Sequence, residues 1–123
     1  MGNVPIRSYR DLEVYQRSLS VLVLVHRILL KFPDYEQREL ASQMRRASKS
    51  VAMNIVEGYG RKRSDKDFKY FLSIAMGSAN EMVVSFEIAK LLGYATEEEC
   101  DALIGEYEII GKQLNRLIQS WSS

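Results

Sequence analysis

The stretch NIVEGYGRKRSDKDF, residues 54–68, separates two long helical patterns and therefore decides how the chain folds. Before it, apolar side chains recur every three or four residues over about residues 36–59. The same period resumes after Ser64, which is a good N-cap residue. Because the connection between them is short, the two predicted helices run antiparallel, and we expect Gly58 and Gly60 to end the first one.

Outward from this turn, the helical period predicts two more helices, and no segment alternates as a strand would. Pro33 ends the first helix, because proline cannot continue it, and Thr96 with Glu99 forms a capping-box pattern before the last one. The four predicted helices cover about residues 11–31, 36–59, 65–92 and 97–121. Short connections predict an all-α, up-down-up-down antiparallel four-helix bundle in a single domain, residues 1–123.

Each predicted helix has an apolar stripe that we expect to face the core. The stripes are Leu12, Tyr15, Leu19, Leu22 and Leu29; Leu40, Met44, Ala47, Val51 and Ile55; Phe68, Phe71, Leu72, Ala75, Ala79, Met82 and Phe86; and Leu103, Tyr107, Ile110, Leu114, Leu117 and Trp121. The third helix also carries apolar residues beside its stripe, such as Tyr70 and Ile88, and the first adds Val21, Val23 and Val25. This surplus predicts a second burial surface, most simply a contact between identical subunits in a homo-oligomer.

The net charge of the chain is +1, so its total charge does not indicate a nucleic-acid or membrane partner. Its distribution is uneven: nine cations against four acids give +5 over residues 38–69, and three against eight give −5 over residues 70–123. The single cysteine, Cys100, excludes an internal disulfide and fits a reducing compartment. The apolar run over residues 19–30 is too short to span a bilayer. We therefore expect a cytoplasmic protein without a membrane partner.

The residues that commonly carry catalysis are scarce. The run Gly58-Tyr59-Gly60 followed by RKRS lacks the preceding strand and the third glycine of a dinucleotide loop, and it lacks the Gly-Lys-Ser/Thr of a Walker loop. Glu57 and Glu81 lack the Glu-x-x-His partners of a di-iron bundle. We expect Asn54, Glu57, Asn80 and Glu81 instead to bond between helices or to arginines at a subunit contact. No catalytic residue, metal ligand or cofactor is predicted.

Basic side chains give the one positive functional signal. On a continuous helix, Arg38, Arg45 and Lys49 would fall within about 40° of one another, opposite the core stripe. The candidate nucleic-acid-binding residues are Arg38, Arg45, Arg46, Lys49, Arg61, Lys62, Arg63, Lys66 and Lys69. Such a surface contacts several phosphates without reading bases. A solvated basic face without a partner is the alternative.

Three stretches also carry a family resemblance: DLEVYQRS near the start, the central run from FPDYEQ to GSANE, and AKLLGY after it. Together they resemble the 23S rRNA intervening-sequence protein family, also called four-helix bundle proteins, over roughly residues 9–121. The resemblance implies a helical bundle without catalytic residues, with some relatives forming pentameric rings that have a basic inner surface. It also implies a link to the accessory subunits of diversity-generating retroelements, which bind a reverse transcriptase and nucleic acid.

The sequence therefore favours a non-enzymatic, homo-oligomeric RNA-binding or nucleic-acid-binding accessory protein, with a reverse transcriptase as a candidate partner. By resemblance, a pentamer is the expected assembly, and Arg45, Arg46 and Lys49 are the expected phosphate contacts. The alternative is a protein-interaction scaffold that recruits another protein and does not bind nucleic acid.

Overall fold

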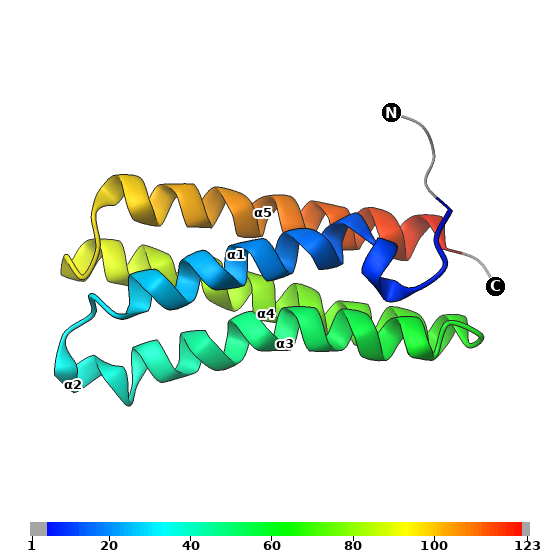
Figure 1. The fold of residues 1–123 in the computed structure, drawn as a ribbon, viewed down its shortest axis with the longest axis horizontal. Coiled ribbons are helices and arrows are strands. Elements are labelled where there is room, and N and C mark those ends of the chain that lie inside the picture. Colours follow the sequence, from blue (N-terminus) through cyan, green and yellow to red (C-terminus); the bar gives the residue numbers. More distant parts are fainter. Residues whose placement is uncertain (1–4, 122–123) are drawn as a thin grey trace.

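The computed structural model describes residues 5–121, which form one helical bundle (Figure 1). A short 3₁₀ turn, η1 (Tyr9–Asp11), precedes the helices α1 (Glu13–Leu29), α2 (Asp34–Gln37), α3 (Leu40–Gly60), α4 (Asp65–Leu92) and α5 (Glu97–Ser120). The four long helices alternate in direction, so the predicted all-α, up-down-up-down bundle is confirmed. Within residues 5–121, no helix is both long and apolar enough to cross a membrane.

Helix α4 lies between α3 and α5 and packs closely on both of them, whereas α1 rests against α3 and α5. The core between the helices is one cluster of apolar side chains. Its largest fully buried members are Tyr107, Phe68, Phe86, Leu29, Met44, Ile55, Leu72, Met82, Ile110 and Leu114. The predicted stripes of α3, α4 and α5 are therefore confirmed in the main, although Leu40, Phe71, Leu117 and Trp121 are only half-buried.

The predicted caps are confirmed. The Ser64 hydroxyl accepts a hydrogen bond from the backbone N–H of Asp67 at 3.2 Å and starts α4. Thr96 and Glu99 form the reciprocal capping box that starts α5. At the other end of α4, Gly93 adopts the left-handed conformation (φ 73°) that stops the helix.

The predicted core face of the first helix is confirmed at Leu12 and Leu29, which are buried, and is wrong between them. Leu19 is 40% exposed and Tyr15 and Leu22 are only half-buried, while the helix buries Val14, Ser18, Val21, Val25 and Leu29. Because Ser18 interrupts this apolar stripe, the stripe was not recognised in the sequence. The Ser18 hydroxyl satisfies itself by donating to the Tyr15 carbonyl at 2.7 Å, so the core tolerates it.

The predicted second helix is divided into α2 and α3, because Glu39 has non-helical dihedral angles (φ −113°, ψ −100°). The predicted helix end is confirmed at Gly60, which is the last residue of α3, whereas Gly58 lies within the helix, and neither glycine has a positive φ. Gly58 is needed for close packing: a Cβ there would lie 3.2 Å from the Phe68 carbonyl oxygen and 3.3 Å from the Phe71 Cβ. It allows the start of α4 to approach α3.

Helix α4 also leaves an apolar stripe on its outer side. Tyr70, Val84, Ile88 and Leu91 are 60%, 53%, 39% and 85% exposed. They recur at intervals of three, four or seven residues and their multiples, so they share one face of the helix, opposite the side that meets the core. The surplus of apolar residues noticed in the sequence is therefore real on α4.

Candidate nucleic-acid interface

The middle of α3 presents cations on its outer surface. Arg46 and Lys49 are exposed, and they lie on the side opposite the buried Met44 and Val51. The Arg46 guanidinium donates to the Ser42 hydroxyl at 2.9 Å. Neither Arg46 nor Lys49 forms an ion pair within residues 5–121.

Arg45, next to Arg46 on α3, forms hydrogen bonds that stabilise the fold. Its guanidinium donates to the Gln37 backbone carbonyl at 2.6 Å and to the Gln37 Oε1 at 3.2 Å. The Gln37 amide in turn donates to the carbonyls of Leu29 at 2.8 Å and Phe32 at 3.0 Å. Arg45 thus ties α2 and the end of α1 to α3, and two of its donor groups already have acceptors.

Arg38 lies outside the predicted arc. It caps α2, one residue before the non-helical Glu39, so it does not share a continuous helix with Arg45 and Lys49. The predicted placement of Arg38 on the same helix face as Arg45 and Lys49 is therefore wrong.

The turn between α3 and α4 carries the second group of cations. Glu57 holds Arg61 in an ion pair at 2.8 Å, and this hydrogen bond raises the pKa of Arg61. The Lys62 ammonium lies 4.0 Å from the centroid of the Tyr59 ring. Arg63 and Lys66 are exposed and Lys69 is half-buried, and none of these three forms an ion pair within the described chain.

The nine candidate residues therefore form two groups rather than one continuous patch. Lys49 and Arg61 are twelve positions apart on the sequence, which corresponds to about 18 Å along the α3 axis. Within this interval a groove of about 600 Å³ opens between α3 and α4. It is lined by Arg46, Lys49, Ser50, Met53, Asn54, Glu57, Arg61 and Phe71. The groove joins the two groups of cations.

Phe71 is the site residue that sequence reasoning missed, because its position on the apolar stripe of α4 predicted a core side chain. It is half-buried, and the Arg61 guanidinium carbon lies 5.1 Å from its ring centroid. Only the crossing of α3 and α4 brings these two residues together. Their spacing in the sequence gives no signal of it.

The expected hydrogen bonds between helices through Asn54, Glu57, Asn80 and Glu81 are absent from residues 5–121. Asn54 bonds to Ser50 on its own helix, and Glu57 bonds to Arg61 one turn later. The remaining two are exposed. The polar bond that does link α3 to α4 joins the hydroxyls of Ser50 and Ser78 at 2.8 Å.

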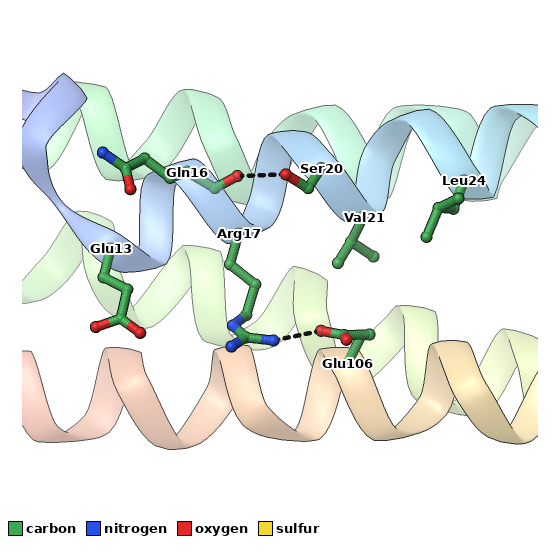
Figure 2. Close-up of a pocket in the computed structure, with 7 residues that line it drawn as sticks. All are labelled: Glu13, Gln16, Arg17, Ser20, Val21, Leu24 and Glu106. Carbon is green, nitrogen blue, oxygen red and sulfur yellow. Dashed lines mark hydrogen bonds and ion pairs between the residues drawn. The ribbon is translucent and has the colours of Figure 1, made fainter.

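A second concave site lies between α1 and α5, with a volume of about 320 Å³ (Figure 2). Figure 2 shows Arg17 reaching from α1 to Glu106 of α5, where its guanidinium donates to the carboxylate at 2.6 Å. Glu13 and Glu106 both line this site, so its one arginine is balanced by acids. It offers little to a phosphate.

The groups with nucleophilic or metal-binding chemistry lie apart from one another. Burial raises the pKa of the Cys100 thiol, and the His26 Nδ1 donates to the Leu22 carbonyl at 3.0 Å. Among residues 5–121, no group of three or more His, Cys, Asp or Glu side chains could hold a metal ion.

The family described as 23S rRNA-intervening sequence protein matches residues 10–116. A similar solved structure comes from Bacteroides thetaiotaomicron VPI-5482 and is described as a protein with unknown function from the S23 ribosomal protein family. It is 28% identical, superposes with a TM-score of 0.76, and the match covers 87% of this chain and 96% of that one. Comparison with curated proteins gave no match. With a match over most of its length, the chain belongs to the 23S rRNA-intervening sequence protein family.

Proposed function

We propose that this protein is a non-enzymatic RNA-binding accessory protein that works as a homo-oligomer. One observation carries the proposal: of the nine candidate cations between Arg38 and Lys69, Arg61 alone forms an ion pair within residues 5–121. Folding therefore leaves most of this positive charge uncompensated, and an RNA backbone supplies the complementary charge.

The groove between α3 and α4 supports the same proposal, because Arg46, Lys49 and Arg61 follow one another along its α3 side. Phosphates that follow α3 would pass Arg46 and Lys49 before reaching Arg63 in the turn and Lys66 at the start of α4. Such contacts position a backbone without reading its sequence. The family description, which concerns sequences inserted in 23S rRNA, favours RNA over DNA as the partner.

The outer stripe of α4 supports self-association. A row of large exposed apolar side chains on one helix face is typical of a helix that packs against another surface. The pentamer comes from the family resemblance and stays a prediction. Light scattering coupled to gel filtration should give a mass several times 14.2 kDa, and a monomer at micromolar concentration would contradict the assembly.

The same stripe favours the second candidate function, a scaffold that recruits another protein and does not bind RNA. A reverse transcriptase is the protein partner that the resemblance suggests. The cytoplasm is the expected location, because the lone thiol is reduced and buried. Absence of RNA binding together with a stable protein complex would favour the scaffold.

Reversal of two charges tests RNA binding. The variant Arg46→Glu with Lys49→Glu changes exposed side chains, so the fold should persist, as thermal unfolding would verify. Affinity for a structured RNA should fall at least about a hundredfold, because two phosphate contacts become repulsive. A folded variant that binds as well as the wild-type protein would show that this surface is not the site.

A further inference from the structure

The pairing of Arg61 with Phe71 gives the α3–α4 groove a flat surface. The Arg61 guanidinium lies over the ring, 5.1 Å from the centroid, and the Glu57 carboxylate accepts from its Nε at 2.8 Å. Gly58 allows this arrangement, because its missing side chain lets Phe71 approach α3. The guanidinium is therefore fixed at both its edge and its face before any ligand arrives.

The groove around this platform has two chemically different parts. Arg46 and Lys49 line one part and have no acidic partner among the described residues. At the platform, Glu57 offsets the charge of Arg61, and its carboxylate repels a phosphate. Met53, 68% exposed, adds an apolar wall. The first part suits a phosphate, and the second suits a neutral, flat, partly apolar group.

We propose that the groove binds a single-stranded segment of RNA, with one unpaired base stacked on the Arg61–Phe71 platform and its backbone along Arg46 and Lys49. Unpaired bases in RNA stack on aromatic rings and on arginine guanidinium planes, whereas bases inside a duplex are already stacked and cannot enter. The inference rests on the proposed function and adds the class of RNA that the site selects.

Glu57 is a positioning residue in this account. Without its carboxylate, Arg61 would be free to swing toward a phosphate. The site would then bind a phosphate in preference to a flat base. The alternative is that the Arg61–Phe71 pair merely stabilises the turn, in which case it has no effect on which RNA binds.

Two conservative variants test the stacking contact. Arg61→Lys keeps the positive charge but loses the planar group, and Phe71→Leu keeps an apolar side chain but loses the ring. The matched control is Arg27→Lys, which makes the same change at an exposed position of α1, outside the candidate interface. The probes are a short single-stranded oligoribonucleotide with one central 2-aminopurine and the corresponding RNA duplex.

Wild-type protein should bind the single strand more tightly than the duplex and quench the 2-aminopurine fluorescence as its base stacks. Arg61→Lys and Phe71→Leu should each weaken single-strand binding about tenfold, remove the quenching and leave the salt dependence unchanged, because stacking involves no counterion. Arg27→Lys should behave as wild type. Thermal unfolding shows whether Phe71→Leu is folded. If it is not, Arg61→Lys still tests the stacking contact, because it changes an exposed side chain.

The outcomes separate the two proposals. If wild-type protein binds both RNAs equally and neither variant changes affinity or quenching, the stacking inference is overturned while RNA binding stands. If wild-type protein binds neither RNA at low salt, both proposals fall. Equal losses of affinity in Arg61→Lys and Arg27→Lys would also overturn the stacking contact, because they would indicate a general effect of replacing an arginine.

Discussion

The two ends of the bundle use their charged residues differently. At the α2 end, formed by α2 and the loop between α4 and α5, two cations are held by partners within the chain: Lys31 pairs with Glu99, and Lys90 lies 2.8 Å from Asp101. Arg38, exposed at the same end, forms no ion pair within residues 5–121. At the turn end, formed by residues 61–64 and the adjoining starts and ends of α3 and α4, Arg63 and Lys66 have no such partner within residues 5–121.

Tyrosine contacts strengthen the α2 end further. The Tyr94 hydroxyl donates to the Glu36 carboxylate at 2.7 Å and lies 3.3 Å from the Tyr35 hydroxyl. These bonds, led by the one to Tyr35, raise the pKa of Tyr94 well above its usual range. The α2 end therefore uses polar groups to stabilise the fold. At the turn end Arg61 alone is paired, with Glu57, and the cations left without an ion pair among the described residues make this end part of the candidate site.

The largest stability effect expected from a charge change lies at Arg45, which belongs to the α2 end. Arg45→Ala removes two hydrogen bonds to Gln37 and should cost about 2 kcal/mol, the usual range for a half-buried bond to a charged donor. Its neighbour Arg46 is exposed, and Arg46→Ala should change stability by less than about 0.5 kcal/mol. Urea denaturation measures both values.

Equal losses of stability in Arg45→Ala and Arg46→Ala would contradict the difference between the two ends of the bundle, because Arg45 would then have no special structural role. RNA affinity gives the opposite ranking: Arg46→Ala should weaken binding more than Arg45→Ala, provided that the second variant is folded at the assay temperature.

A smaller effect is expected at Glu99. Its pKa is lowered to about 2, chiefly by the hydrogen bond from Lys31 and then by the backbone bond at Thr96. A lowered pKa in the folded state stabilises the protein above the ordinary value of 4.5, and this contribution is lost as the pH falls from 4.5 towards 2.

The variant Glu99→Gln removes the titrating group, so its stability deficit should be present at pH 6 and should shrink between pH 4.5 and about 2. Because Glu99 is only partly buried and its partner Lys31 is exposed, the deficit should be smaller than that of Arg45→Ala and should decrease with salt. Thermal unfolding across pH measures it. A deficit that is independent of pH would show that the Lys31 pair does not carry the contribution.

Local signals explain what the sequence predicted well. The caps at Ser64 and Thr96 depend on a few neighbouring residues, so they could be identified from the chain alone. Helices α3 and α5 also have a single dominant apolar face, whereas α4 carries a second one on its outer side. In α1 apolar residues occupy two faces, and only contact with α3 and α5 decides that Val21 and Val25 are buried.

The site could be predicted only in part, because its cations are local but its geometry is not. The sequence identified Arg46, Lys49 and the turn residues as candidates. It could not show that the Arg45 guanidinium donates a hydrogen bond to Gln37, or that Arg61 lies over the ring of Phe71 from the neighbouring helix. Both contacts depend on how elements pack, and the break at Glu39 that displaces Arg38 has no proline or glycine to signal it.

The salt dependence of RNA affinity tests the central claim most directly. The logarithm of the association constant should fall linearly with the logarithm of salt concentration, by about 0.7 per phosphate contacted on a single strand. Neutralising Arg46 and Lys49 with glutamine should reduce that slope by about 1.4, whereas Lys90→Gln at the α2 end should leave it unchanged. A wild-type affinity that does not depend on salt, or an equal change in slope from Lys90→Gln, would contradict the account.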